Sequence, residues 1–268
     1  MTDQRGVRDR PGRPPWRRSP VREALVELGR VIVPEQCPGC GAWDVALCGP
    51  CLRHLQGQVR RVEEAAARLD DVRHGALPAW AVASYTGPVR AAVVAWKDRG
   101  RADLGPILGA EVRRAAAALV PTLKEVTGGA ELLVVPVPST AAARRRRGAD
   151  LVGDLASAAA DGLRAGGQRA RVDHALAHRR HGVRDQVGLG ARARGRNTAA
   201  TFGLRVAPAA PGGRWCLLVD DVITTGSTVS ACAGVLSAAG ALVAGALLLA
   251  ATPTPGRSGH EVILSTGA

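Results

Sequence analysis

Two adjacent carboxylates and a hydroxyl-rich turn stand together late in the chain. The apolar run CLLV leads directly into Asp220 and Asp221, and a turn of small polar residues follows at once. A turn of this kind that opens a helix exposes several backbone N–H groups, which bind phosphate together with the helix dipole. We therefore expect a phosphate at the backbone and hydroxyl groups of Thr224, Thr225, Gly226, Ser227 and Thr228.

Carboxylates repel phosphate but accept hydrogen bonds from a vicinal diol. A ligand with a phosphate at one end and a cis-diol further along, such as ribose 5-phosphate, suits both groups. An apolar run ending in Asp-Asp is also typical of the magnesium-holding strand of nucleotide hydrolases, but neither lysine of the chain, Lys97 or Lys124, stands in the GxxxxGK[ST] loop that those enzymes need. A simple helix cap at Ser227 or Thr228 explains the turn but not the carboxylates.

Four cysteines form a second constellation in two CxxC pairs. The pairs are separated by a short spacer with Gly and Pro beside them, so the turns can aim four sulfurs at one point. This pattern predicts a closed, structural zinc site; a redox-active CxxC is the alternative, although redox chemistry needs one pair rather than two. The expected zinc ligands are Cys37, Cys40, Cys48 and Cys51, whereas Cys216 and Cys232 stand in apolar elements and are expected in the core.

Apolar strands joined through helices must position these groups. Continuous apolar runs over 79–85, 131–138, 214–222 and 241–252 predict buried strands, with two helices between 87 and 123 and further helices over 148–163 and 227–240. Strands without polar alternation are typical of a parallel sheet that is covered on both faces. We expect an α/β fold with both carboxylates at the carboxyl end of a central strand, where open parallel sheets bind ligands.

The stretch VDDVITTGST resembles the phosphoribosyl pyrophosphate (PRPP) signature of the type I phosphoribosyltransferases. More narrowly, the four-cysteine module, YTGPVRAAVVAWKDRGR, VVPVPSTAAARRRRGAD, HRRHGVRDQVGLGARARGRNTAATF and that signature occur in the order of the ComF family, whose members are competence-associated phosphoribosyltransferase homologues. The resemblance covers roughly 34–252. The chain departs from the family where Ala149, Asp150 and Leu151 replace a frequent Phe-Asn-Gln.

The resemblance implies a type I phosphoribosyltransferase-like sheet that binds PRPP with Mg²⁺. Asp220 and Asp221 would then hold the ribose hydroxyls, directly or through the ion, and the 224–228 turn would hold the 5-phosphate. The pyrophosphate is assigned to Lys97, Ser139, Thr140 and Arg147. Two alternatives stay open, namely that residues 144–147 are a solvated helix start and that Lys97 is an ordinary surface residue.

A long Arg-, Gly- and His-rich stretch over 176–202 resembles the flexible loop that closes over PRPP. Its candidate contacts to the pyrophosphate are Arg179, Arg180, Arg194 and Arg196, while His178 and His181 are expected to be polar loop residues rather than bases. Loops of this length inside a compact domain are usually functional lids or disordered segments.

Charge and composition set the remaining expectations. Lys and Arg outnumber Asp and Glu by 36 to 23, and the net charge of +13 favours anionic partners. We expect an Arg/Pro-rich arm over 1–33, disordered at least to about residue 20, a zinc module and linker over 34–75, the phosphoribosyltransferase-like domain over 76–252 and a tail over 253–268. No secretory signal and no apolar run long enough for a membrane helix is seen, which predicts a cytoplasmic protein without membrane insertion.

Three functions are compatible with these features. The first is an enzyme that transfers phosphoribose from PRPP to a nitrogenous acceptor. The second is a non-catalytic sensor of PRPP or a nucleotide. The third is a competence factor that binds single-stranded DNA during DNA uptake, although the chain has one Phe and one Tyr and so lacks the usual aromatic stacking platform. The acceptor, turnover, DNA binding and oligomeric state are not fixed by the sequence.

Overall fold

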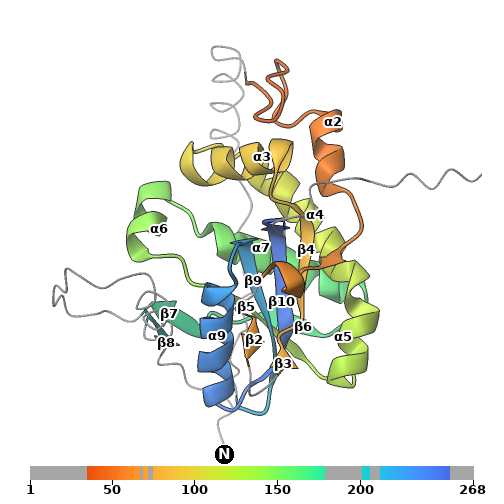
Figure 1. The fold of residues 1–268 in the computed structure, drawn as a ribbon, viewed down its shortest axis with the longest axis vertical. Coiled ribbons are helices and arrows are strands. Elements are labelled where there is room, and N and C mark those ends of the chain that lie inside the picture. Colours follow the sequence, from red (N-terminus) through yellow and green to blue (C-terminus); the bar gives the residue numbers. More distant parts are fainter. Residues whose placement is uncertain (1–34, 67–68, 72–74, 179–200, 206–211, 254–268) are drawn as a thin grey trace, which may run out of the picture.

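The computed structural model describes residues 35–66, 69–71, 75–178, 201–205 and 212–253. The expected arm over 1–33 and the tail beyond residue 253 lie outside these residues. Within them, Figure 1 shows a mostly parallel sheet flanked by helices. The α/β class and the parallel sheet predicted from the apolar strands are confirmed.

The central sheet has six strands in the order β1-β4-β10-β9-β5-β6. All neighbours are parallel except β1, which pairs antiparallel with β4 at one edge. The two longest strands, β9 and β10, lie at the centre, where both of their faces are covered, and this explains their uninterrupted apolar sequences. The strands are β1 (Arg60–Arg61), β4 (Ala79–Ser84), β5 (Leu132–Pro136), β6 (Ala170–Val172), β9 (Trp215–Ile223) and β10 (Leu242–Ala251).

Helices cover both faces of the sheet. One face carries α3 (Gly87–Asp98), α4 (Leu104–Ala118), α5 (Val120–Thr127) and α7 (Leu151–Ala165), and the other carries α9 (Ser227–Ala238), as Figure 1 shows. The segment expected to form two helices forms three, because Gly100 turns the chain after α3 with a φ of 72° and Pro121, which has no N–H to donate, stands in the first turn of α5. Within the described ranges, no helix has the length and apolarity needed to cross a bilayer.

Short elements flank the strands of the sheet. Helix α6 (Ala141–Arg147) follows β5, and the 3₁₀ turn η2 (Glu63–Ala65) follows β1. Two small antiparallel pairs complete the fold: β2 (Asp70–Asp71) with β3 (Gly75–Ala76), and β7 (Leu176–His178) with β8 (Phe202–Leu204). Strand β1 therefore joins the main sheet although it lies in the segment expected to be module and linker.

The cysteine-containing segment packs against α3 and α4. It contains α2 (Gly49–Leu52) and the 3₁₀ turn η1 (Arg53–Leu55), whose Leu55 is fully buried in the main core. Arg101, which follows α3, donates to the carbonyls of Gln36 at 2.8 Å and Ala46 at 3.3 Å, while Asp103 pairs with the same guanidinium at 2.7 Å. One arginine thus fixes the loops of the module to the sheet domain.

Close packing between α4 and α7 builds the layer behind the sheet. Small residues lie in this contact, with Gly109 of α4 facing Ala158 of α7 and Gly162 of α7 facing Ala116 of α4, so the two helix backbones approach closely. A Cβ built on Gly162 of α7 would stand 2.1 Å from the carbonyl oxygen of Arg113 in α4. Because backbone atoms cannot yield as a flexible side chain can, no residue larger than glycine fits here without separating the helices.

Gly162→Ala is expected to destabilise the fold by about 3 kcal/mol, because overpacking moves α7 away from α4. Gly234→Ala is the matched control, since Gly234 is an exposed glycine of α9 whose Cβ would meet nothing within 4 Å. The control should be unchanged or more stable by up to about 1 kcal/mol. Urea unfolding of both variants measures the difference, and equal midpoints would contradict this account of the interface.

Candidate functional site

The carboxylate pair lies where β9 extends beyond β5. The last register pair between these strands is Pro136 with Val219, so Asp220 and Asp221 protrude past the end of β5 while still pairing with β10 on the other side. The N–H of Asp221, which β5 no longer reaches, donates to Oδ1 of Asp220 at 2.8 Å. The strand continues to Ile223 and the helix begins at Ser227, so the intervening turn is shorter than the sequence suggests.

Asp221 points to the α3 face of the sheet and meets Lys97. Its Oδ2 lies 2.7 Å from Nζ of Lys97, and its Oδ1 accepts from the N–H of Val222 at 2.6 Å. The side chain of Asp221 is 9% exposed and that of Lys97 is 27% exposed, so water screens this pair only in part. Lys97, expected beside the pyrophosphate, therefore forms an ion pair with Asp221.

Asp220 points to the opposite face, because successive side chains of a strand alternate. Burial and the adjacent charge of Asp221 raise the pKa of Asp220 well above its ordinary value, against the weaker opposing effects of the Asp221 N–H and the Lys97 charge. Burial, followed by the charge of Asp220, also raises the pKa of Cys232 in α9. Lys97 thus neutralises Asp221, and among the residues that the structure describes no cation forms an ion pair with Asp220.

The turn after β9 and the first residues of α9 enclose a small hollow, which we call the helix-start hollow. Its volume is about 220 Å³, and it is lined by residues 220 and 222–229. The first helical hydrogen bond runs from the N–H of Ser230 to the carbonyl of Gly226, so the helix carbonyls do not reach the amides of residues 227–229. Thr225 and Ser227 join their hydroxyls at 3.1 Å across the rim. These donors surround a space suited to an anion.

Gly226 determines the shape of the helix-start hollow. Its φ of 79° lies in the left-handed region that favours glycine, and its added Cβ would approach Leu69 Cγ to 2.9 Å and Ala66 Cβ to 3.2 Å. Ala66 and Leu69 are buried beneath the turn. No pattern in the sequence indicates this support, because the two residues lie more than 150 positions before the turn and are brought there by the path of the chain after β1.

The turn between β5 and α6 carries the other candidate anion contacts, and we call residues 137–140 the β5–α6 turn. Thr140 accepts from the N–H of Ala143 at 3.1 Å and so caps α6, which occupies its hydroxyl. Ser139 is half-buried, and its carbonyl accepts from Arg144 at 2.7 Å. Of the four consecutive arginines of α6, Arg147 is the least exposed.

Arg147 lies close to the end of α3. Its Nη2 stands 3.9 Å from Oδ1 of Asp98, the residue after Lys97, and its buried Nε has no hydrogen-bond partner among the described residues. Lys97 and Arg147 therefore gather around the same end of α3, whereas Ser139 and Thr140 belong to the neighbouring turn. Sequence spacing gives no sign of Asp98 as the link between them.

The expected flexible loop has ordered ends. Its flanks pair as β7 and β8, and His178 in β7 donates from Nε2 to the carbonyl of Pro138 at 2.9 Å and contacts the ring of Phe202. His178 is thus a strand residue that holds the β5–α6 turn. The arginines expected to reach the pyrophosphate, and also His181, lie outside the described residues: Arg179, Arg180, Arg194 and Arg196.

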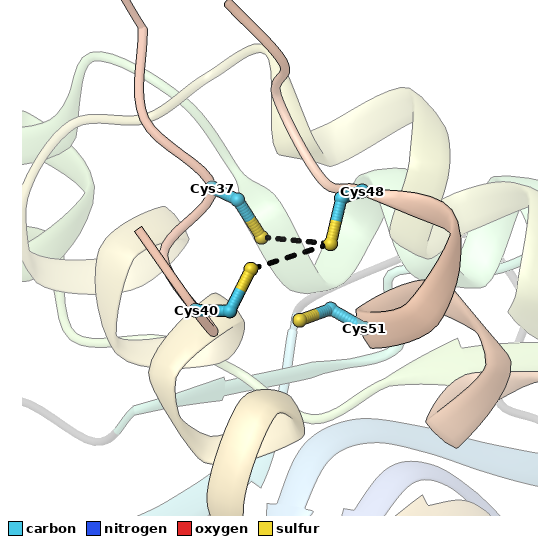
Figure 2. A group of neighbouring side chains, drawn as sticks. All are labelled: Cys37, Cys40, Cys48 and Cys51. Atoms are coloured by element: carbon cyan, nitrogen blue, oxygen red, sulfur yellow. Dashed lines mark hydrogen bonds between the residues drawn. The ribbon is translucent and has the colours of Figure 1, made fainter. Parts of the chain in front are cut away.

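The four cysteines of the module converge, as Figure 2 shows. Their sulfurs lie within 4.8 Å of one another, with 3.6 Å between Cys37 and Cys48 and 3.4 Å between Cys40 and Cys48. Burial opposes ionisation of Cys37, but the backbone N–H groups of Cys48, Cys40 and Gly39 and the Cys48 side chain lower its pKa to about 6. The cluster can therefore hold a metal ion, as the two CxxC pairs predict.

No protein-family model matches the chain, and no curated protein matches it either. The assignment of a function therefore depends on the two constellations described above, namely the carboxylate edge with its helix-start hollow and the four-cysteine cluster.

Asp220→Asn is expected to stabilise the fold near pH 7.5 by about 1 kcal/mol or more, because it removes a buried charge while keeping the acceptor for the Asp221 N–H. Since the pKa of Asp220 is raised on folding, its favourable contribution is fully present below the unfolded value of about 3.9 and is lost as the pH rises through the folded value. The gain should thus disappear towards pH 4.

Urea unfolding of wild type and variant across pH 4 to 8 measures this effect, with the exposed Glu125→Gln as a control that should follow the wild type. A constant difference between Asp220→Asn and wild type at every pH would show that the substitution acts through packing rather than through charge.

Proposed function

We propose that the chain binds PRPP with Mg²⁺ at the carboxyl end of β9 and transfers its phosphoribosyl group to a nitrogenous acceptor. One observation carries this proposal: a carboxylate pair and a hollow at the amino end of α9 adjoin each other at the same strand end. Such a site suits a ligand that presents a diol to carboxylates and a phosphate to N–H groups. Ribose 5-phosphate compounds have this arrangement, and PRPP adds an anionic leaving group.

Different residues of the site contact different parts of the ligand. Residues 224–228 bind the 5-phosphate through amides and hydroxyls, and Asp220 and Asp221 orient the ribose hydroxyls. As the bond between C1′ and pyrophosphate breaks, negative charge develops on the leaving group, and the cations at the end of α3, Lys97 and Arg147, stabilise it. The contribution is positional and electrostatic, because these residues form no covalent bond to the sugar.

The carboxylate pair fits a magnesium ion. Its oxygens are hard ligands of the type that Mg²⁺ prefers, and Asp221 Oδ2 already holds a cation in the form of the Lys97 ammonium. When bound with PRPP, Mg²⁺ neutralises charge on the pyrophosphate. Asp221 and Asp220 would hold the ion or its waters, and the raised pKa of Asp220 fits a pair that lacks one positive charge.

The four-cysteine cluster is proposed to hold structural zinc. Sulfurs of a tetrahedral site lie roughly 3.8 Å apart when each Zn–S bond is about 2.3 Å, close to the separations of Cys48 from Cys37 and Cys40. A site with four thiolates has no open position for chemistry. Its role is to hold together the loops that Arg101 fixes to the sheet domain.

The order of the motifs supports a ComF-like protein with a role in DNA uptake. A non-catalytic sensor would use the same contacts, so turnover has to be measured directly. Incubation with PRPP, Mg²⁺ and a panel of nitrogenous bases should release pyrophosphate with at least one base. PRPP binding without any release would favour the sensor, and absence of PRPP binding would exclude both functions.

Cys40→Ser should abolish stoichiometric zinc binding, because a serine hydroxyl does not ionise to replace the thiolate, whereas the wild type should carry about one zinc ion per chain. Cys232→Ala is the control, since Cys232 is buried in α9 away from the cluster and its loss should leave the zinc content unchanged. Elemental analysis of the purified proteins measures the metal. Equal zinc in wild type and Cys40→Ser would exclude a four-cysteine site.

Asp221→Asn should weaken PRPP binding in the presence of Mg²⁺ by about thirtyfold or more, because it removes one charge of a largely buried ion pair while keeping the shape of the side chain. Its zinc content should equal that of wild type, which shows that the fold is intact. Isothermal titration calorimetry measures the affinity, with Asp161→Asn on the exposed side of α7 as the control. Unchanged affinity in Asp221→Asn would place the ligand elsewhere.

A further inference from the structure

A second concave site lies on the β6 side of the sheet, and we call it the basic groove. Its volume is about 260 Å³, and it occupies the space between the carboxyl end of β5, the start of α7 and the β7–β8 pair. None of its lining residues belongs to the helix-start hollow or to β9 and β10. The residues that matter here are Pro138, Arg144, Asp150, His174, Leu176 and Arg205.

The charges of the basic groove are unbalanced. Arg144 and Arg205 both line it, and among the described parts of the chain neither guanidinium forms an ion pair with a carboxylate. The one carboxylate in the lining, Asp150, is the N-cap of α7, where its Oδ1 accepts from the N–H of Gly153 at 3.4 Å. Two guanidinium groups without carboxylate partners around one hollow are suited to a phosphate group, which they can bind through paired hydrogen bonds.

The remaining lining combines His174 with an apolar strip. Pro136, Val137 and Leu176 are buried and form one wall, and Pro138 continues it. A volume of about 260 Å³ exceeds what a lone phosphate requires and lies just below the usual range of small-ligand sites, roughly 300 to 1,000 Å³. An apolar wall beside a pair of arginines matches a ligand with a flat, weakly polar part and a phosphate.

We propose that the basic groove binds a free nucleoside monophosphate, with the phosphate between Arg144 and Arg205 and the nucleoside against the proline- and leucine-lined wall. This site is separate from the proposed PRPP site. Its existence does not depend on that proposal, because the groove, its charges and its wall are independent of the carboxylate pair.

Occupancy of the basic groove would affect the β5–α6 turn. Arg144 donates to the carbonyl of Ser139 at 2.7 Å, and His178 donates to that of Pro138 at 2.9 Å, so two successive carbonyls of this turn are held from the groove side. A phosphate that engages Arg144 competes with the Ser139 carbonyl for the same guanidinium. The nucleotide would then loosen the β5–α6 turn. Neither the binding nor the loosening rests on the proposed function, but any effect of the loosening on pyrophosphate binding does.

The test uses adenosine 5′-monophosphate as the probe and Thr228→Glu as the background. The added carboxylate at the start of α9 repels phosphate from the helix-start hollow, so binding that remains is binding elsewhere. In this background the monophosphate should bind at one site. Adding Arg205→Gln should lower the affinity for the monophosphate roughly tenfold or more. Arg146→Gln, a neighbouring exposed arginine of α6 that does not line the groove, should leave the affinity unchanged.

Each other outcome overturns the proposal in a recognisable way. Equal affinity in the Arg205→Gln and Arg146→Gln variants would show that the groove is not the site. Equal binding of adenosine and its monophosphate would exclude the phosphate contact, and tighter binding of a short oligothymidylate would make a nucleic acid strand the ligand instead. The single variant Arg205→Gln, without Thr228→Glu, tests the proposed function separately. It should still bind PRPP in the presence of Mg²⁺, because Arg205 does not line the helix-start hollow.

Discussion

The placement of two adjacent carboxylates at the end of a buried strand is the constraint on which the rest of this structure depends. Like charges this close, in surroundings that exclude water, oppose folding unless cations or donors reach them. Lys97 supplies one charge to Asp221, and the strand's own amides supply hydrogen bonds to both carboxylates. Burial and the charge of Asp221 nevertheless keep the pKa of Asp220 raised. A ligand that brings positive charge or hydroxyl groups would therefore suit this edge.

The end of α3 connects the parts of the molecule that carry chemistry. Lys97 contacts the carboxylate edge, Asp98 lies beside Arg147 of α6, and Arg101 holds the loops of the cysteine module. Five consecutive positions thus join three segments that are far apart in sequence. A structural metal in the module would be connected to the carboxylate edge through this helix end, which gives the module a positional role in the proposed function.

Sequence patterns predicted more of the fold than of the site. Uninterrupted apolar strands determined the parallel sheet, and two CxxC pairs determined the cysteine cluster, because both depend on local residue types and spacing. The separate helix α5 was not predicted, because the apolar residues before and after Pro121 keep the spacing of one continuous helix. Strand β1 was missed as well, because two exposed arginines carry no strand pattern.

The sequence by itself determined which chemical groups are present: a carboxylate pair, a small-residue turn, four thiols and an excess of arginine. Only the tertiary structure decided which of them meet. It placed Lys97 on Asp221 rather than beside Ser139 and Thr140, and it set Ala66 beneath Gly226. The physical reason is that local spacing fixes only neighbours along a helix or strand, whereas these contacts depend on the order of strands in the sheet and on the path of the chain across its faces.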